Sequence, residues 1–279
     1  MKIPNIENIV KYMNIFVDTR SNRMKNVRHF INNETGITYS FSIKDGEGIF
    51  SFYTKKSTIN FIRNFSNFRK KKLSVKGEKI HDKDRFYYNK FLETTDYLDS
   101  VAMNFRNTKM INPFRNYKFR EEKVADPCLY LKTEFNKNKI YIHSGFVYLF
   151  NSIASHYFTL LTNALENKEI KKIVIIGHGF GGAIAKIAFL SGILAHPGKS
   201  DIIEGYFYGS PKVGNTPFES CIGGFKCSHV RFADDYLTEM PMESIGYATP
   251  KKEIVLAREE YDNCKQTDSY TYAKYLNKY

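Results

Sequence analysis

The pattern of hydrophobic and polar positions predicts strands and helices that alternate along the chain. The stretch 173–179 (IVIIGHG) is apolar on both faces, which is typical of a strand buried in a parallel sheet. It is followed by 182–196, an alanine-rich stretch typical of a helix, which Pro197-Gly198 should end. Further strands are predicted at 206–209 and 229–233. This alternation predicts an α/β fold in which helices flank a mostly parallel central sheet.

The first part of the chain adds a helix and a hairpin to this picture. Residues 6–17 have a helical pattern, and 37–54 look like two strands joined at Asp45-Gly46-Glu47-Gly48, a turn-forming cluster. Further along the chain, just before the strand at 173–179, residues 140–146 read as the end of a strand and 147–167 as a long amphipathic helix.

An aromatic and basic segment lies between these two parts. Residues 59–72 look helical, with Phe61, Phe65 and Phe68 on one face. Residues 63–90 contain ten Lys or Arg against three acids. An aromatic face beside a basic cluster suits an anionic lipid surface, but it also suits a helix packed on the core with a solvated basic face. We interpret residues 1–279 as a single domain with an insertion at about 66–138.

Composition changes this picture only modestly. The net charge of +13 is compatible with an anionic partner, whereas abundant Lys, Asn, Ile, Phe and Tyr also fit an AT-rich genome. No recognised nucleic-acid-binding motif is present, so specific nucleic-acid binding is not expected. The N-terminus lacks a signal-peptide pattern, and no stretch of 18 apolar residues suggests a transmembrane helix, so an intracellular protein is expected. The four cysteines should be reduced thiols without zinc-ligand spacing, and no metal or cofactor is predicted.

The segment with the most chemical information is Gly177-His178-Gly179-Phe180-Gly181-Gly182. In an α/β hydrolase, G-x-S-x-G stands at a sharp turn from strand to helix, and the turn exposes the serine hydroxyl. A loose phosphate-binding loop is the alternative that this glycine pattern leaves open.

Three linked motifs resemble the class 3 (fungal-type) lipase family. Residues 177–185 (GHGFGGAIA) resemble its G-H-S-x-G-G-A-x-A, 208–215 (YGSPKVGN) resemble F-G-x-P-R-V-G-N, and 142–146 (IHSGF) resemble V-H-x-G-F. Their order and spacing agree with the family, and the resemblance is strong over about 140–247. It implies the α/β-hydrolase fold and a lipid ester as the ancestral substrate.

The resemblance also locates the positions of the catalytic triad. Gly179 stands where the nucleophilic serine would be, and Asp235 stands on the catalytic aspartate. Ser269 stands where D-H-x-x-Y would supply the histidine, and no histidine follows His229. The backbone N–H of Phe180 would be one oxyanion donor. No catalytic site is therefore intact, since a serine hydroxyl needs a base to become nucleophilic.

The second oxyanion donor has two candidate positions. The family's F-R-G-T loop best matches 52–57 (FYTKKS), while 91–95 (FLETT) is a rival at a more usual distance from His143. Neither keeps the R-G pair.

These losses favour an inactive pseudolipase that retains binding of lipid, membrane or a protein partner. The alternative is an active lipase or esterase with a rebuilt site. That site would need Ser144, Ser210 or a cysteine as nucleophile, with His143, His178 or His229 as base.

Overall fold

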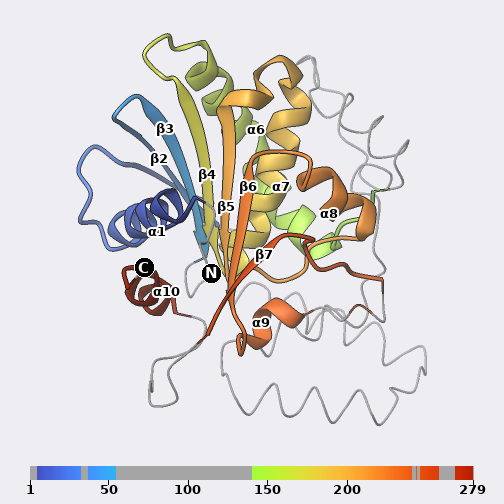
Figure 1. Ribbon diagram of the computed structural model, residues 1–279. Helices are drawn as coiled ribbons and strands as arrows, with labels where there is room; N and C mark the ends of the chain where they lie inside the picture. Colours follow the sequence, from blue (N-terminus) through green and yellow to red (C-terminus); the bar gives the residue numbers. More distant parts are fainter. Residues whose placement is uncertain are drawn as a thin grey trace.

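The computed structural model describes residues 5–32, 37–54, 140–240, 243, 246–257 and 268–278. Within them, one sheet of seven strands follows the order of the sequence (Figure 1). The strands are β1 (Arg28–Ile31), β2 (Ile37–Lys44), β3 (Glu47–Thr54), β4 (Lys172–His178), β5 (Ile203–Tyr208), β6 (Cys227–Phe232) and β7 (Glu253–Leu256). β1, β2 and β3 are antiparallel to one another, and β3 to β7 are parallel.

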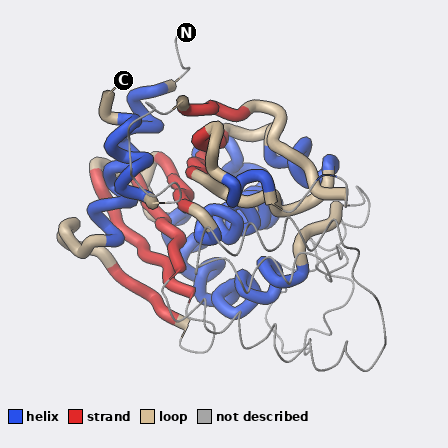
Figure 2. Tube along the Cα trace, turned by 90° about the horizontal axis from the view of Figure 1, so that it is seen from below, coloured by secondary structure: helices blue, strands red, loops and turns tan. Residues whose placement is uncertain are grey.

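Helices cover both faces of the sheet. They are α1 (Ile6–Arg20), α6 (Ser144–Glu166), α7 (Phe180–Ala195), η1 (Pro197–Ile202), α8 (Thr216–Ile222), α9 (Tyr236–Glu239) and α10 (Ser269–Leu276). α1 and α10 lie together on one face, and α6 and α7 pack on the other (Figure 1). Figure 2 shows the sheet as a curved layer between these helices. The predicted α/β class and the mostly parallel sheet are confirmed.

The alternation of side chains in β4 explains why this strand reads as continuously apolar. Ile173 and Ile175 pack into the core beneath α6 and α7, whereas Val174 and Ile176 pack into the core beneath α1 and α10. All four side chains are fully buried. A central strand that is covered on both faces has no polar side to reveal its period.

The structure confirms the predicted hairpin and contradicts one predicted strand. The hairpin at 37–54 is confirmed, with Asp45 and Gly46 at positive φ in its turn. Residues 140–146 do not end a strand: Ile142 makes only an isolated bridge to Gly214, and α6 begins at Ser144. The backbone at 140–143 pairs with a loop instead of with a sheet strand, which explains the error. The predicted helix at 59–72, and most of the insertion at about 66–138, lie outside the described residues.

The described helices include none whose length and hydropathy would allow it to cross a membrane.

Candidate functional site

The turn between β4 and α7 is sharp, and Gly179 occupies it. Its backbone has φ 58° and ψ −127°, a conformation that residues with a side chain rarely adopt. Its N–H donates to the carbonyl of Tyr208 in the neighbouring strand at 2.9 Å. Among the residues that the structure describes, a Cβ added at Gly179 would meet only Leu237 Cδ2, at 3.7 Å. These residues leave room for a side chain, and the restriction that they show comes from the backbone.

Two further glycines let the helix approach the sheet at this turn. A Cβ at Gly177 would lie 2.4 Å from the carbonyl oxygen of Gly181. A Cβ at Gly181 would lie 2.1 Å from the carbonyl oxygen of Phe52, near the end of β3. Both distances exclude a side chain. The end of β3 thus lies directly against the first turn of α7, as the first oxyanion candidate (52–57) requires. The rest of that candidate after Thr54, and all of the rival at 91–95, lie outside the described residues.

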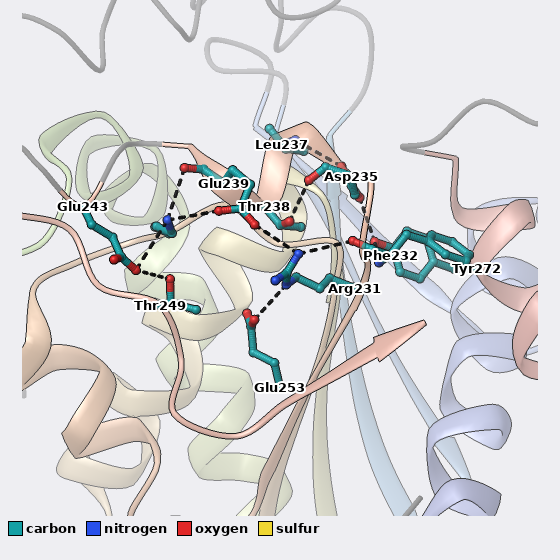
Figure 3. Close-up of polar contacts among 11 residues, drawn as sticks. Arg231, Phe232, Asp235, Leu237, Thr238, Glu239, Glu243, Thr249, Glu253 and Tyr272 are labelled. Atoms are coloured by element: carbon teal, nitrogen blue, oxygen red, sulfur yellow. Dashed lines mark hydrogen bonds and ion pairs between the residues drawn. The ribbon is translucent and has the colours of Figure 1, made fainter. Parts of the chain in front are cut away.

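Asp235 follows β6 and is buried, with 1% of its surface exposed. Its Oδ1 accepts the N–H of Leu237 at 3.1 Å, which caps the short helix α9. Its Oδ2 accepts the hydroxyl of Tyr272 at 2.7 Å (Figure 3). The Tyr272 hydroxyl also accepts the N–H of Phe232 at 3.2 Å. The carboxylate therefore joins the end of β6 to helix α10.

A group of charged residues fixes the loop that carries Asp235 (Figure 3). Arg231 lies 3.0 Å from Glu239 and 2.8 Å from Glu253. Lys212, which is 5% exposed, lies 3.5 Å from the Glu239 carboxylate and also donates to its backbone carbonyl. Both ends of α9 are thus held, by Asp235 at its start and by two cations at its end. Lys212 belongs to the motif at 208–215, but the sequence did not predict that Glu239 would be its partner.

Ser269 lies at the start of α10, where the resemblance expects a histidine. It is fully buried, and its Oγ accepts a hydrogen bond from Nη1 of Arg20 at 2.8 Å. Tyr272 on the same helix, three residues later, is the residue whose side chain reaches Asp235. Sequence reasoning missed both Arg20 and Tyr272 as members of this site. Tyr272 fills the Tyr position of D-H-x-x-Y, whereas nothing in the local sequence links Arg20 to it.

The two outer motifs are joined to each other by Asn215. Its side chain accepts the N–H of Tyr141 at 3.1 Å and that of Phe218 at 3.2 Å, and so caps α8. Its own N–H donates to the carbonyl of Tyr141, and the N–H of His143 donates to Val213. These bonds explain why the motifs at 142–146 and 208–215 occur together.

His178 immediately precedes the turn at Gly179, which we call the elbow, and its side chain points away from α7. Its ring packs against Phe16 and Tyr272, with centroid distances of 6.1 and 5.3 Å. Burial, with a smaller contribution from the charge of Arg20, lowers the pKa of His178 to about 3. His178 therefore remains neutral at physiological pH. Its Nε2 is buried and has no hydrogen-bond partner among the residues that the structure describes.

The candidates for a rebuilt site lie apart or are otherwise engaged. Ser210 Oγ donates to the carbonyl of Pro211 at 3.1 Å. Cys227 Sγ lies 3.6 Å from His229 Nε2, but burial raises the pKa of Cys227 to about 11 and suppresses the thiolate. Cys227 begins its strand, at the opposite end of the sheet from the elbow. The side chain of Ser144 is outside the described part of the chain.

The strand order and the strand–turn–helix elbow at Gly179 define an α/β hydrolase. Residues 103–245 match the family described as Lipase (class 3), and the chain belongs to that family.

Individual relatives agree with this assignment. A secreted mono- and diacylglycerol lipase of Malassezia globosa is 26% identical over 109 residues, which are 38% of this chain and 35% of that protein. The chain thus matches about a third of the length of this curated relative. Among solved structures, lipase II from Rhizopus niveus has a TM-score of 0.56 at 15% identity and covers 92% of this chain and 82% of that one. The mono- and diacylglycerol lipase from Aspergillus oryzae has a TM-score of 0.56 at 14% identity, with 96% and 86% covered.

Proposed function

We propose that this class 3 lipase family member is catalytically inactive and retains the binding of lipid, of a membrane surface or of a protein partner. The observation that supports this most directly is the elbow at Gly179. Its backbone has the strand–turn–helix conformation in which an α/β hydrolase holds its nucleophilic serine, but glycine has no side chain to attack an ester. Loss of the nucleophile or of the base in a serine hydrolase costs on the order of 10⁶ in turnover. The 279 residues would form a single lipase-like domain with an insertion at about 66–138.

The surroundings of Ser269 support the loss of the base independently. A hydroxyl group cannot take a proton from a second hydroxyl at neutral pH. The guanidinium of Arg20, 2.8 Å from Ser269 Oγ, would also oppose the imidazolium that a histidine here must become during catalysis. Two separate changes at the nucleophile and base positions favour repurposing over a single accidental substitution.

Lipid is the favoured ligand because the family's acyl esters define the ancestral site. The lipid surface suggested by the aromatic and basic segment 59–90 stays a prediction, since that segment lies outside the described residues. Lipid extraction and mass spectrometry of the purified chain would test whether acyl chains remain bound. A purified protein that carries no lipid, and that binds none from vesicles, would leave only the protein-partner form of the proposal.

Ester hydrolysis tests the loss of activity. The purified full chain and the variants Gly179→Ser, Gly179→Ser/Ser269→His and Gly198→Ser would be assayed on nitrophenyl butyrate and tributyrin. We expect no hydrolysis by the parent or by the single variants and weak hydrolysis at most by the double variant. Gly198→Ser is the matched control, because a Cβ at Gly198 meets no atom of the described residues within 4 Å.

Two outcomes would contradict the proposal. Robust hydrolysis by the parent would establish the alternative, an active lipase or esterase with a rebuilt site. Robust hydrolysis by Gly179→Ser alone would reveal a base close to the elbow that the residues described here do not identify.

A further inference from the structure

The loop between α1 and β1 carries a cluster of exposed positive charges. Residues 20–28 contain four Lys or Arg and no acid, and all four side chains are exposed. Arg20 already donates to Ser269, so the charges that remain available are Arg23, Lys25 and Arg28, which we call the basic loop. The chain from Arg23 to Arg28 spans at most about 18 Å, so these charges form one local patch.

Little negative charge offsets the basic loop. Arg23 lies 3.8 Å from Asp18, but the two side chains are 62% and 51% exposed, so water screens this pair. Neither Lys25 nor Arg28 forms an ion pair with a residue that the structure describes. The positive charge of the patch is therefore available to a partner.

The backbone holds the basic loop in a defined shape. Asn22 and Asn26 have positive φ angles of 57° and 58°, a conformation that asparagine adopts more readily than most residues. The N–H groups of Arg23 and Met24 donate to the carbonyl of Asp18, at 2.9 and 3.4 Å. Met24 also packs against the core beneath α1 and α10. The charges are thus presented on an ordered surface, and a partner does not have to order the loop in order to bind.

This surface lies at the side of the sheet, away from the elbow. β1 is the first strand of the sheet and lies three strands away from β4, which leads into the elbow (Figure 1). Ile31, the last residue of β1, is 47% exposed, so an apolar side chain follows the charges along the strand. Cations beside an exposed apolar side chain suit an anionic bilayer, where charged headgroups meet acyl chains. A nucleic-acid backbone would use the charges but would gain little from Ile31.

We propose that the basic loop binds the surface of a membrane that contains anionic phospholipids, with Ile31 in contact with the interface. The inference rests on the proposed membrane-binding function and names the surface and the class of lipid that carry it. Each Lys or Arg close to an anionic leaflet contributes about fivefold to binding, so the three together contribute on the order of a hundredfold. This attraction is screened beyond about 10 Å, so basic residues at the far end of the protein contribute little.

The test measures how the full-length protein partitions onto sedimented vesicles. One kind of vesicle is phosphatidylcholine alone, and the other is an equal mixture of phosphatidylcholine and phosphatidylserine. The basic-loop variant carries Arg23→Gln, Lys25→Gln and Arg28→Gln together. Thermal unfolding of each variant would separate a loss of binding from a loss of fold.

The matched control removes the same amount of charge elsewhere. It carries Lys168→Gln, Lys171→Gln and Lys199→Gln, three exposed lysines just before β4 and β5, at the edge of the sheet opposite to the elbow. Exposed acids lie among them in the sequence, at 166, 169 and 201, so these lysines do not form a patch of one sign.

We expect the parent and the control to bind the mixed vesicles strongly and the neutral vesicles weakly. The basic-loop variant should lose on the order of a hundredfold in its partition onto mixed vesicles, whereas the control should lose less than about fivefold. Ile31→Ser should weaken the binding of mixed vesicles and leave the binding of a heparin fragment unchanged.

The inference is overturned if the parent does not distinguish the two vesicles, or if the control loses as much as the basic-loop variant, since net charge alone would then explain the binding. It is also overturned if Ile31→Ser leaves vesicle binding unchanged or weakens heparin binding equally, outcomes that would assign the loop to a soluble polyanion. Mixed-vesicle binding that survives in the basic-loop variant would refute the inference but leave the proposed membrane binding standing at another surface. Hydrolysis of the vesicle lipids would instead refute the inactive site.

Discussion

Replacing Gly179 by alanine isolates the cost of the elbow's backbone conformation. Of the described residues, the new Cβ would meet only Leu237 Cδ2, at 3.7 Å, so none of them contributes a steric overlap. A residue with a side chain at φ 58° is strained by about 1–3 kcal/mol. Loss of glycine's freedom in the unfolded chain returns about 0.4–1 kcal/mol. The net loss has an upper limit of about 2.6 kcal/mol and a central value of about 1.3 kcal/mol, and the central value lowers Tm by roughly 3–5 °C in a protein of this size.

Two other glycines bracket this value in the same thermal unfolding assay. Gly198→Ala should leave Tm almost unchanged, because a Cβ there meets no atom of the described part of the chain within 4 Å. Gly181→Ala should cost clearly more than Gly179→Ala, because its Cβ would lie 2.1 Å from the backbone oxygen of Phe52. The reasoning fails if Gly179→Ala unfolds at the temperature of the parent, or if it is more disruptive than Gly181→Ala.

Three further changes test buried polar groups, two of them beside the site and one, the Lys186–Glu219 pair, away from it. Tyr272→Phe should cost about 1–3 kcal/mol in urea unfolding, because it removes the acceptor of the buried Phe232 N–H and a donor to Asp235, whereas the exposed Tyr270→Phe should have no effect. Lys186→Met should cost about 3–5 kcal/mol by leaving Glu219 buried without its cation 3.5 Å away. Burial raises the pKa of Glu219, so this loss should be smaller at pH 5 than at pH 8; an equal loss would contradict the argument. Burial lowers the pKa of His178 to about 3, so below about pH 6.5 the unfolded chain binds a proton that the folded protein does not. The free energy of unfolding should therefore be constant above pH 6.5 and should decrease by at most about 3 kcal/mol as the pH falls to 4. His178→Gln should remove this decrease.

The parts of the fold that sequence predicted are those with strong local signals. The hairpin follows from Asp45-Gly46, whose positive φ angles of 53° and 75° are those that its turn needs. The short edge strands β1 and β7 were missed. β1 has three exposed residues of four, so no buried face gives it a period of two. Edge strands of this length are defined by their neighbour in the sheet, which the local sequence does not contain.

The candidate site was predictable where a motif fixes the backbone and unpredictable where distant segments meet. Gly179 was placed at its turn because the flanking glycines identify a strand–turn–helix junction. Arg20 could not be placed, because it is 249 residues away from Ser269 in the chain. Only the packing of α1 against α10 brings the two together. Motifs therefore locate the positions that correspond to the family's site, whereas the tertiary structure identifies which distant residues meet there.

The survival of Asp235 does not by itself indicate hydrolysis, and one pair of substitutions tests this. Its carboxylate caps α9 and accepts the Tyr272 hydroxyl, so the residue has a structural role that needs no histidine. Asp235→Ala should cost about 2–4 kcal/mol in urea unfolding, because it removes a helix cap and leaves a buried hydroxyl without its acceptor. Asp235→Asn keeps an acceptor for Leu237 N–H and should cost less.

The neighbouring Asp234→Ala is the control, since Asp234 is exposed and should change stability little. If Asp235→Ala unfolded like the parent, the contacts of the carboxylate would carry no stability and its presence would again need a catalytic explanation. If the expected loss of stability appears, the structural role of Asp235 would be enough to account for its presence. The question of activity then depends on Gly179 and Ser269, because an aspartate supports acyl transfer only together with a nucleophile and a base.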